Sequence, residues 1–157
     1  MKGNKKIAEL LELYDKKLSK LFKYNKKKAM SFDKDSRLQL QEKYGIYVIF
    51  NAHKKPVFVG QSGGYLNNHQ RAKKDLCDKL GQYNLKSDAG TLRFKRAYAL
   101  DNDLVVDDAK AIKAEDYNLK VQYIEVKENP ALINILETLA LEYAKEKDFK
   151  LYNFYNK

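Results

Sequence analysis

Two short apolar segments separated by four mostly polar residues are the feature of this sequence that most constrains its fold. The segments GIYVIFN at 45–51 and PVFVGQS at 56–62 are rich in β-branched and aromatic residues, which favour strands. The residues between them, 52–55, have the length of a hairpin loop. We therefore expect the two segments to pair as antiparallel strands, with the rest of the chain arranged around this hairpin.

Helical patterns surround the hairpin. Between residues 7 and 22 apolar side chains recur every three or four positions, which predicts an amphipathic helix docked on the body of the protein. Ser31 or Asp33 could cap a short second helix that runs through Leu40. Further helices are expected at 66–80, 91–100 and 131–147, and a third strand is expected at 119–126. The pattern assigns residues 101–116 to neither loop nor helix.

These elements predict an α/β (α+β) fold in which a short central antiparallel sheet is flanked by helices. The chain has 157 residues, of which 44% are hydrophobic, and this is enough for one core. Its character changes at Tyr44, where the first strand approaches. We therefore divide the chain into a basic helical N-terminal arm, residues 1–43, and a main domain, residues 44–157.

The formal charge of +10 favours a polyanionic partner. Residues 1–43 carry 13 basic and 6 acidic side chains, and residues 44–96 carry 10 and 3. Residues 97–157 carry 8 and 12, so the basic surface should lie on the first two thirds of the chain. A solvated lysine surface without a partner is the alternative interpretation of the same charge.

The cysteine and histidine content argues against disulfide and zinc frameworks. Cys77 is the single cysteine and cannot form an internal disulfide, and with His53 and His69 it gives too few ligands for the usual four-ligand zinc site. This composition suggests a reducing cytoplasm. No apolar run approaches the ~18 residues of a membrane span, and the polar start MKGNKK lacks the apolar region of a signal peptide. We expect no membrane association.

The hairpin also carries a recognisable motif. Gly45-Ile46-Tyr47 is followed eleven residues later by Phe58-Val59-Gly60, and an arginine, a glutamate and an asparagine follow in later segments. In this order and spacing, residues 44–155 resemble the GIY-YIG nuclease superfamily, with FVG as a degenerate YIG. The resemblance implies an endonuclease that hydrolyses DNA phosphodiester bonds with Mg²⁺ or Mn²⁺, most simply in duplex DNA. It fits restriction-like or mobile-element roles, and a homodimer would let both strands be cut.

The resemblance also implies roles for individual residues. Tyr47 would place a phenol near the attacking water, and it would need a lowered pKa to act as a base. Arg71 would hold phosphate oxygens, Glu137 would bind the metal ion, and Asn153 would orient neighbouring groups. Without the motif, Tyr47 would be an ordinary core aromatic and Arg71 a solvated charge.

Glu142 is the alternative metal ligand. Glu137 lies on or beside the apolar face of its predicted helix, where an unpaired carboxylate is costly. Glu142 has Lys145 and Glu146 three and four residues later, as on a solvent-facing surface. We therefore prefer Glu137.

Two positions depart from the family pattern. Phe58 replaces the tyrosine of YIG, and Asp75 occupies the position four residues after Arg71 where many members carry a histidine. These departures support a second hypothesis, in which the chain keeps the fold and binds nucleic acid but is catalytically weak or inactive.

Basic residues after the hairpin are candidate contacts to DNA phosphates. They are Lys73, Lys74, Arg93, Lys95 and Arg96. Such contacts give affinity and salt dependence without sequence preference. The lysines of the N-terminal arm either extend this surface or belong to a packing or dimerisation element.

Overall fold

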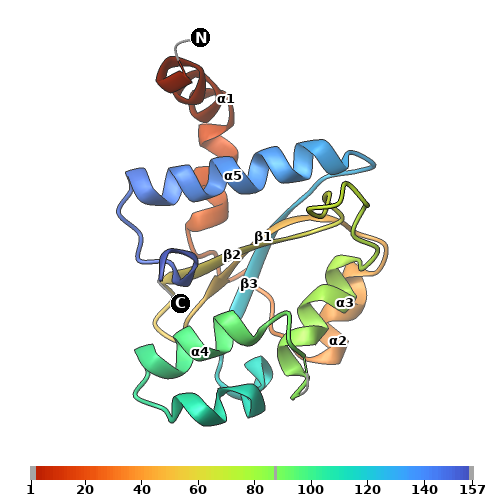
Figure 1. The fold of residues 1–157 in the computed structure, drawn as a ribbon, viewed down its shortest axis with the longest axis vertical. Coiled ribbons are helices and arrows are strands. Elements are labelled where there is room, and N and C mark those ends of the chain that lie inside the picture. Colours follow the sequence, from red (N-terminus) through yellow and green to blue (C-terminus); the bar gives the residue numbers. More distant parts are fainter. Residues whose placement is uncertain (1–2, 87, 156–157) are drawn as a thin grey trace.

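A three-stranded antiparallel sheet forms the centre of the protein (Figure 1). The computed structural model describes residues 3–86 and 88–155. The strands are β1 (Gly45–Phe50), β2 (Pro56–Ser62) and β3 (Lys120–Glu125), in the order β2-β1-β3. The predicted hairpin, the third strand and the α/β class are therefore confirmed. β1 is central, so β2 and β3 provide the two edges of the sheet.

The side chains of β1 alternate between two cores, one on each face of the sheet. Ile46, Val48 and Phe50 pack against α1 (Gly3–Phe22) and α5 (Pro130–Glu146). Tyr47 and Ile49 point to the opposite face, where α3 (Leu76–Gly81) and α4 (Leu92–Asp101) lie. Figure 1 shows α5 above the sheet and α3 and α4 below it. Because both faces are covered, all six residues of β1 are buried.

The N-terminal arm contributes to both cores. The C-terminal part of α1 is docked through Leu18, Leu21 and Phe22, whereas the N-terminal part projects from the body (Figure 1) and leaves Ile7 and Leu10 38% and 37% exposed. The predicted docking of this helix is therefore correct only for its second half. The arm continues with α2 (Lys34–Arg37) and a 3₁₀ turn (Leu38–Leu40).

Asp33, rather than Ser31, caps α2. Its Oδ2 atom accepts a hydrogen bond from the backbone N–H of Ser36 at 3.0 Å. The neighbouring Phe32 and, beyond α2, Leu40 are fully buried in the same core as Tyr47. This part of the arm is thus packed as an integral portion of the body.

The predicted helix at 66–80 is wrong for most of its length. Residues 63–75 form a loop in which Tyr65 and Arg71 make an isolated β-bridge, and His69 has a positive φ of 59°. The polar run NNHQR offers no apolar face to hold a helix. The side chain of Asn134 fixes the loop by bonding both the N–H and the C=O of Tyr65. The helix, α3, begins only after Asp75, its N-cap.

The remaining predicted elements are found with small shifts of their ends. α4 and α5 match the helices expected at 91–100 and 131–147. The segment left unassigned contains two 3₁₀ helices, Val106–Ala111 and Ala114–Asp116. None of the described helices combines the length and the apolar character needed to cross a lipid bilayer.

Candidate active site at the β2 edge

Tyr47 lies over the glycine of the second motif. It projects from β1 opposite Gly60 of β2, and a Cβ atom at Gly60 would lie 2.3 Å from the Tyr47 ring. Only glycine leaves room for the phenol at this point. Gly45 is equally constrained, because its Cβ would lie 1.9 Å from the carbonyl oxygen of Ile124. Both motif glycines thus serve close packing around Tyr47 and its strand.

The remaining motif residues build the walls around this position. Ile46 and Val59 are buried in the core beneath α5. Phe58 is half-buried on the same face as Tyr47 and packs edge to face against Phe94, with ring centroids 5.5 Å apart. Phe58 therefore adds an apolar wall where the family pattern has a second phenol.

A second phenol comes instead from Tyr83, which sequence reasoning missed. The hydroxyl oxygens of Tyr47 and Tyr83 are 2.8 Å apart, and either can be the donor. Tyr83 lies in the 3₁₀ turn Gln82–Asn84 that continues α3, and it is buried between Phe32 and Phe94. Asp75 starts α3 by accepting a hydrogen bond from Asp78 N–H at 2.8 Å, so it fixes where this helix points.

Lys79 and Glu137 complete the cluster. Lys79, on α3, lies four residues before Tyr83, and its half-buried ammonium group is attracted by Asp88 and, more weakly, by Glu137. Glu137, on α5, is half-buried and makes no hydrogen bond or ion pair within residues 3–86 and 88–155. We call Tyr47, Lys79, Tyr83 and Glu137 the β2-edge site, since they surround the side of the sheet that β2 closes.

Burial dominates the electrostatics of the β2-edge site. It raises the pKa of Tyr47 well above the usual value, and the nearby Tyr83 and Glu137 act in the same direction. Burial likewise raises the pKa of Tyr83 and of Glu137 and lowers that of Lys79. The lowered pKa that Tyr47 would need to act as a base is therefore not provided by the residues around it. Both phenols stay protonated at neutral pH and act as hydrogen-bonding groups.

Asn153 holds the outer edge of β2. Its side-chain Oδ1 accepts from the N–H of Val59 and its Nδ2 donates to the C=O of Val59, both at 2.9 Å. The amide thus pairs with the strand as another strand would. Arg93 on α4 in turn donates to the backbone oxygen of Asn153. Both polar atoms of the Asn153 amide are thus bonded to the Val59 backbone, so Asn153 positions β2 and its motif.

The structure does not bring Arg71 into this cluster. Arg71 lies in the exposed loop, where its guanidinium carbon is 5.1 Å from the centroid of the Tyr44 ring. Lys79 on α3 is the cation that interacts with Glu137 instead, and Tyr83 follows it four residues later. That spacing in the sequence, Lys79-x-x-x-Tyr83, was the available signal.

Glu142 and Asp75 are both engaged elsewhere. The Glu142 carboxylate pairs with Lys145 at 3.6 Å and lines a groove against α1. The Asp75 carboxylate accepts from the N–H groups of Asp78 and Glu42. Asp75, Cys77 and Asp78 place possible ligand atoms within 4.8 Å of one another, but the capping bonds account for Asp75. The geometry thus favours Glu137 over Glu142 as a ligand beside Tyr47.

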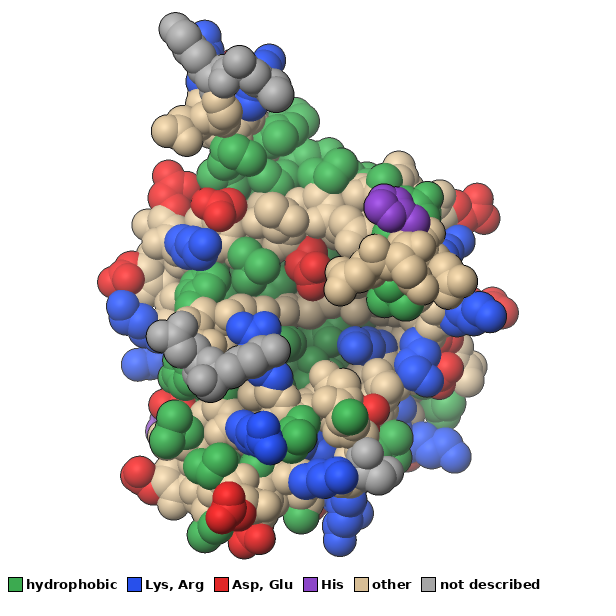
Figure 2. Space-filling model, in the orientation of Figure 1, with side chains coloured by type: hydrophobic (Ala, Val, Ile, Leu, Met, Phe, Trp, Pro, Cys, Tyr) green, Lys and Arg blue, Asp and Glu red, His purple; other side chains and the backbone are tan. Residues whose placement is uncertain are grey.

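Four of the five predicted phosphate contacts are exposed. Lys73 and Lys74 lie in the loop before α3, and Arg93 and Arg96 lie on α4. Lys95 is a correction, because it is only 1% exposed and its Nζ donates to the backbone oxygen of Leu85 at 2.8 Å. Figure 2 looks onto the side of the molecule that β2 closes and shows basic side chains gathered below α5, over α3 and α4.

The β2-edge site offers one carboxylate to a metal ion. Mg²⁺ commonly keeps several waters and binds through one or two carboxylates plus substrate phosphate. Glu137 fits that requirement because its carboxylate is half-buried and has no hydrogen bond or ion pair with another described residue.

Comparisons of the chain with protein-family models, with curated proteins and with solved structures found no match.

Proposed function

We propose that this protein is a metal-dependent endonuclease of the GIY-YIG type, which hydrolyses phosphodiester bonds of DNA at the β2-edge site. One observation carries the proposal. The hydroxyls of the glycine-seated Tyr47 and of Tyr83 are in contact, and the half-buried Glu137 on α5 acts electrostatically on both phenols and on the half-buried Lys79 of α3. Clusters of buried titratable groups with opposing charges are typical of catalytic sites.

The residues of the cluster divide the work of phosphodiester hydrolysis. Lys79 provides positive charge for the phosphate oxygens, and the buried surroundings strengthen that interaction. The paired hydroxyls of Tyr47 and Tyr83 orient water and phosphate by hydrogen bonding. Glu137 would hold Mg²⁺ or Mn²⁺, which when bound stabilises charge on the leaving oxygen. Arg93 and Arg96 on α4, with Lys73 and Lys74, would contact the flanking DNA backbone.

Proton removal from the attacking water sets a condition on this proposal. A phenol with a raised pKa is a poor base at neutral pH. The pKa of Tyr47 falls when positive charge approaches it, from Lys79 or from a cation held by Glu137. The proposed reaction is therefore expected to require the metal and to accelerate as the pH rises.

A nucleic-acid-binding protein without cleavage activity is the second candidate function. Phe58 removes a hydroxyl from the site, and the raised pKa of both remaining phenols disfavours base catalysis. Under this alternative the exposed basic residues would bind DNA while the cluster stayed inert.

Plasmid nicking separates the two functions. Wild-type protein and Tyr47→Phe are incubated with supercoiled plasmid in Mg²⁺, in Mn²⁺ and in EDTA. The endonuclease proposal predicts nicking by wild type that EDTA abolishes, and a loss of about 10²-fold in Tyr47→Phe. Tyr14→Phe, a change to a phenol on α1, is the matched control and should leave the rate unchanged. Binding of the plasmid without nicking in either metal would favour the second function.

A further inference from the structure

A basic groove runs along the opposite edge of the sheet, beside β3. It has a volume of about 710 Å³ and lies between the C-terminal half of α1, the segment 27–31, α2 with its following turn, and β3. Its lining contains four lysines, no acidic residue, and several neutral polar residues. The lysines are Lys17, Lys20, Lys27 and Lys28, and the neutral polar residues include Ser31, Ser36 and Gln39.

The framework of the groove is held in place by Gln122. This buried side chain accepts from Asn25 N–H at 2.7 Å and donates to the carbonyl oxygens of Leu21 and Lys23 at 3.2 and 3.0 Å. Next to it, Met30 and Val121 exchange two backbone hydrogen bonds. The end of α1 and the lysine-bearing turn are therefore fixed to β3, so the four lysines are presented on a defined surface.

The charge of the groove is uncompensated. All four lysines are exposed, and none takes part in an ion pair among the residues that the structure describes, 3–86 and 88–155. Four like charges around one hollow repel one another, and a bound polyanion relieves that repulsion. Lys17 and Lys20 are three residues apart on α1, and Lys27 and Lys28 are adjacent in the turn that follows, so the groove offers several positive charges to a single polyanion.

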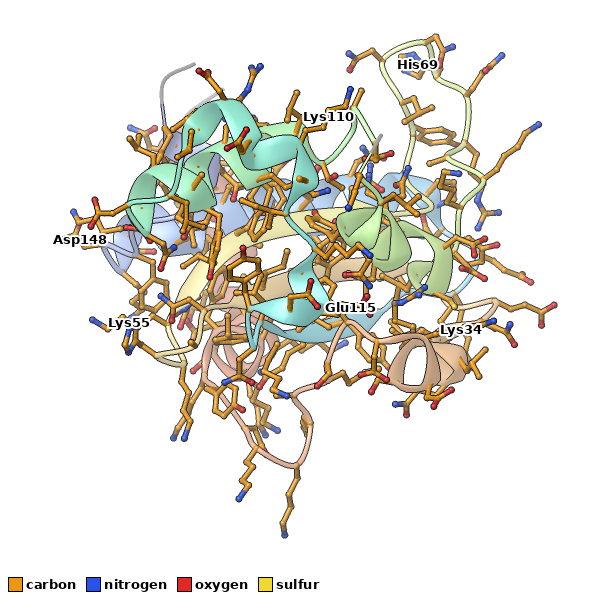
Figure 3. All side chains as sticks on the ribbon, turned by 90° about the horizontal axis from the view of Figure 1, so that it is seen from below. Lys34, Lys55, His69, Lys110, Glu115 and Asp148 are labelled. Carbon is orange, nitrogen blue, oxygen red and sulfur yellow. The ribbon has the colours of Figure 1, made fainter. Side chains whose placement is uncertain are left out.

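We propose that this groove binds one strand of a nucleic-acid backbone, through phosphate contacts to Lys17, Lys20, Lys27 and Lys28. The inference rests on the nucleic-acid partner of the proposed function but does not require cleavage. The lysines of the arm do not extend the basic surface formed by Lys73, Lys74, Arg93 and Arg96. In Figure 3 the segment joining α1 to α2 lies on the lower side with Lys34, whereas the loop carrying His69 lies on the upper side. The groove thus holds a different segment of nucleic acid from the one at the β2-edge site.

The test compares a groove variant with a charge-matched control in EDTA, where cleavage is absent. The groove variant carries Lys→Gln at positions 17, 20, 27 and 28. The control carries Lys→Gln at positions 5, 110, 147 and 150, which are exposed and lie outside the groove. Binding of a fluorescein-labelled strand of 20 nucleotides is followed by anisotropy at several salt concentrations. The groove variant should reduce the slope of log K against log salt by about 3, since each single-strand phosphate contact contributes about 0.7. The control should keep most of the wild-type slope.

Lysine acetylation of the wild-type protein provides a measurement that needs no variant. Saturating oligonucleotide should slow modification of Lys17, Lys20, Lys27 and Lys28 at least several-fold, and should leave Lys110 and Lys150 unchanged. Equal slopes for the two variants, or unprotected groove lysines, would overturn the proposal. A poly-glutamate peptide of equal charge that binds as tightly and displaces the strand would also overturn it, in favour of an acidic protein partner.

These outcomes are separable from the failure of the proposed function. If wild type does not nick DNA but the oligonucleotide protects the groove lysines, the groove stands and the nuclease proposal fails. If wild type nicks DNA and the groove lysines stay unprotected, the nuclease proposal stands and the groove proposal fails.

Discussion

The two edges of the sheet carry different chemistry. At the β2 edge, Lys79 and Glu137 are half-buried beside two buried phenols, and burial moves the pKa of every one of these groups. At the β3 edge, four exposed lysines surround a groove without an acidic partner. Desolvation shifts the pKa values of titratable side chains, as is typical of catalytic sites, whereas solvated lysines provide only electrostatic attraction for an anionic partner. This difference is why we propose chemistry at the first edge and binding at the second.

The largest expected effect is on the nicking rate, which should depend on Lys79 but hardly on Arg71. Lys79→Ala should lower the rate of plasmid nicking about 10²- to 10³-fold, because under the proposed function it removes the half-buried positive charge beside the phosphate. Arg71→Ala should change the rate less than about threefold, since Arg71 lies in the exposed loop against Tyr44. Initial nicking rates at saturating DNA give the comparison. A larger loss in Arg71→Ala than in Lys79→Ala would place the reacting phosphate elsewhere.

The next effect concerns the stability of the β3 edge. Gln122→Ala should reduce the free energy of unfolding by about 3 kcal/mol, because it leaves the N–H of Asn25 and the carbonyls of Leu21 and Lys23 without their partner. Urea unfolding followed by circular dichroism measures the loss. Gln70→Ala, in the exposed loop, is the control and should stay within about 0.5 kcal/mol of wild type. Equal stability of the two variants would show that Gln122 does not anchor the turn.

Asn153 has the corresponding role at the β2 edge, with a smaller effect. Asn153→Ala removes two hydrogen bonds to the backbone of Val59 and should cost about 2 kcal/mol in the same urea measurement. The exposed Asn67→Ala serves as control. A metal-ligand role for Asn153 predicts something else, namely unchanged stability together with weaker dependence on Mg²⁺, and that result would contradict the positioning role.

The smallest effect is a gain of stability at the proposed metal ligand. Burial raises the pKa of Glu137, so the folded protein binds the proton more tightly than the unfolded chain does. Stability therefore falls as the pH rises above about 4.5, the usual value, and Glu137→Gln should increase the melting temperature at pH 7.

The gain in melting temperature of Glu137→Gln should disappear near pH 4. There residue 137 is mostly neutral in both proteins, as protonated glutamic acid in wild type and as glutamine in the variant. Glu142→Gln is the matched control on the same helix, and it should not be stabilised because its carboxylate is partly exposed beside Lys145. A lower melting temperature of Glu137→Gln at pH 7 would mean that the carboxylate has a stabilising partner.

Much of the fold could be predicted because its signals are local. The hairpin, the third strand and α5 each have a residue pattern with the matching period and a clear stop, such as Asn129-Pro130 before α5. The loop at 63–75 could not be predicted from the same signals. Its conformation depends on a tertiary contact, the pairing of Asn134 with the backbone of Tyr65.

The candidate site was predicted in part for the same reason. Tyr47 could be identified from the motif, and Glu137 could be preferred because it lies on or beside the apolar face of its helix. Lys79 and Tyr83 depend on where α3 begins, and the sequence contained that signal in Asp75, a helix cap with Asp78 in the first turn. Nothing local indicates that the hydroxyls of Tyr47 and Tyr83 meet, because the contact joins residues 36 positions apart through the packed core.

The most direct test of the chemistry proposed for the β2 edge is Mg²⁺-dependent plasmid nicking by Glu137→Gln and Glu142→Gln, measured side by side with wild type. The two variants make the same chemical change on the same helix, one within the β2-edge site and one outside it. We predict that Glu142→Gln nicks at the wild-type rate and that Glu137→Gln loses at least about 10²-fold. Nicking by Glu137→Gln at the wild-type rate would contradict the assignment of chemistry to the β2 edge.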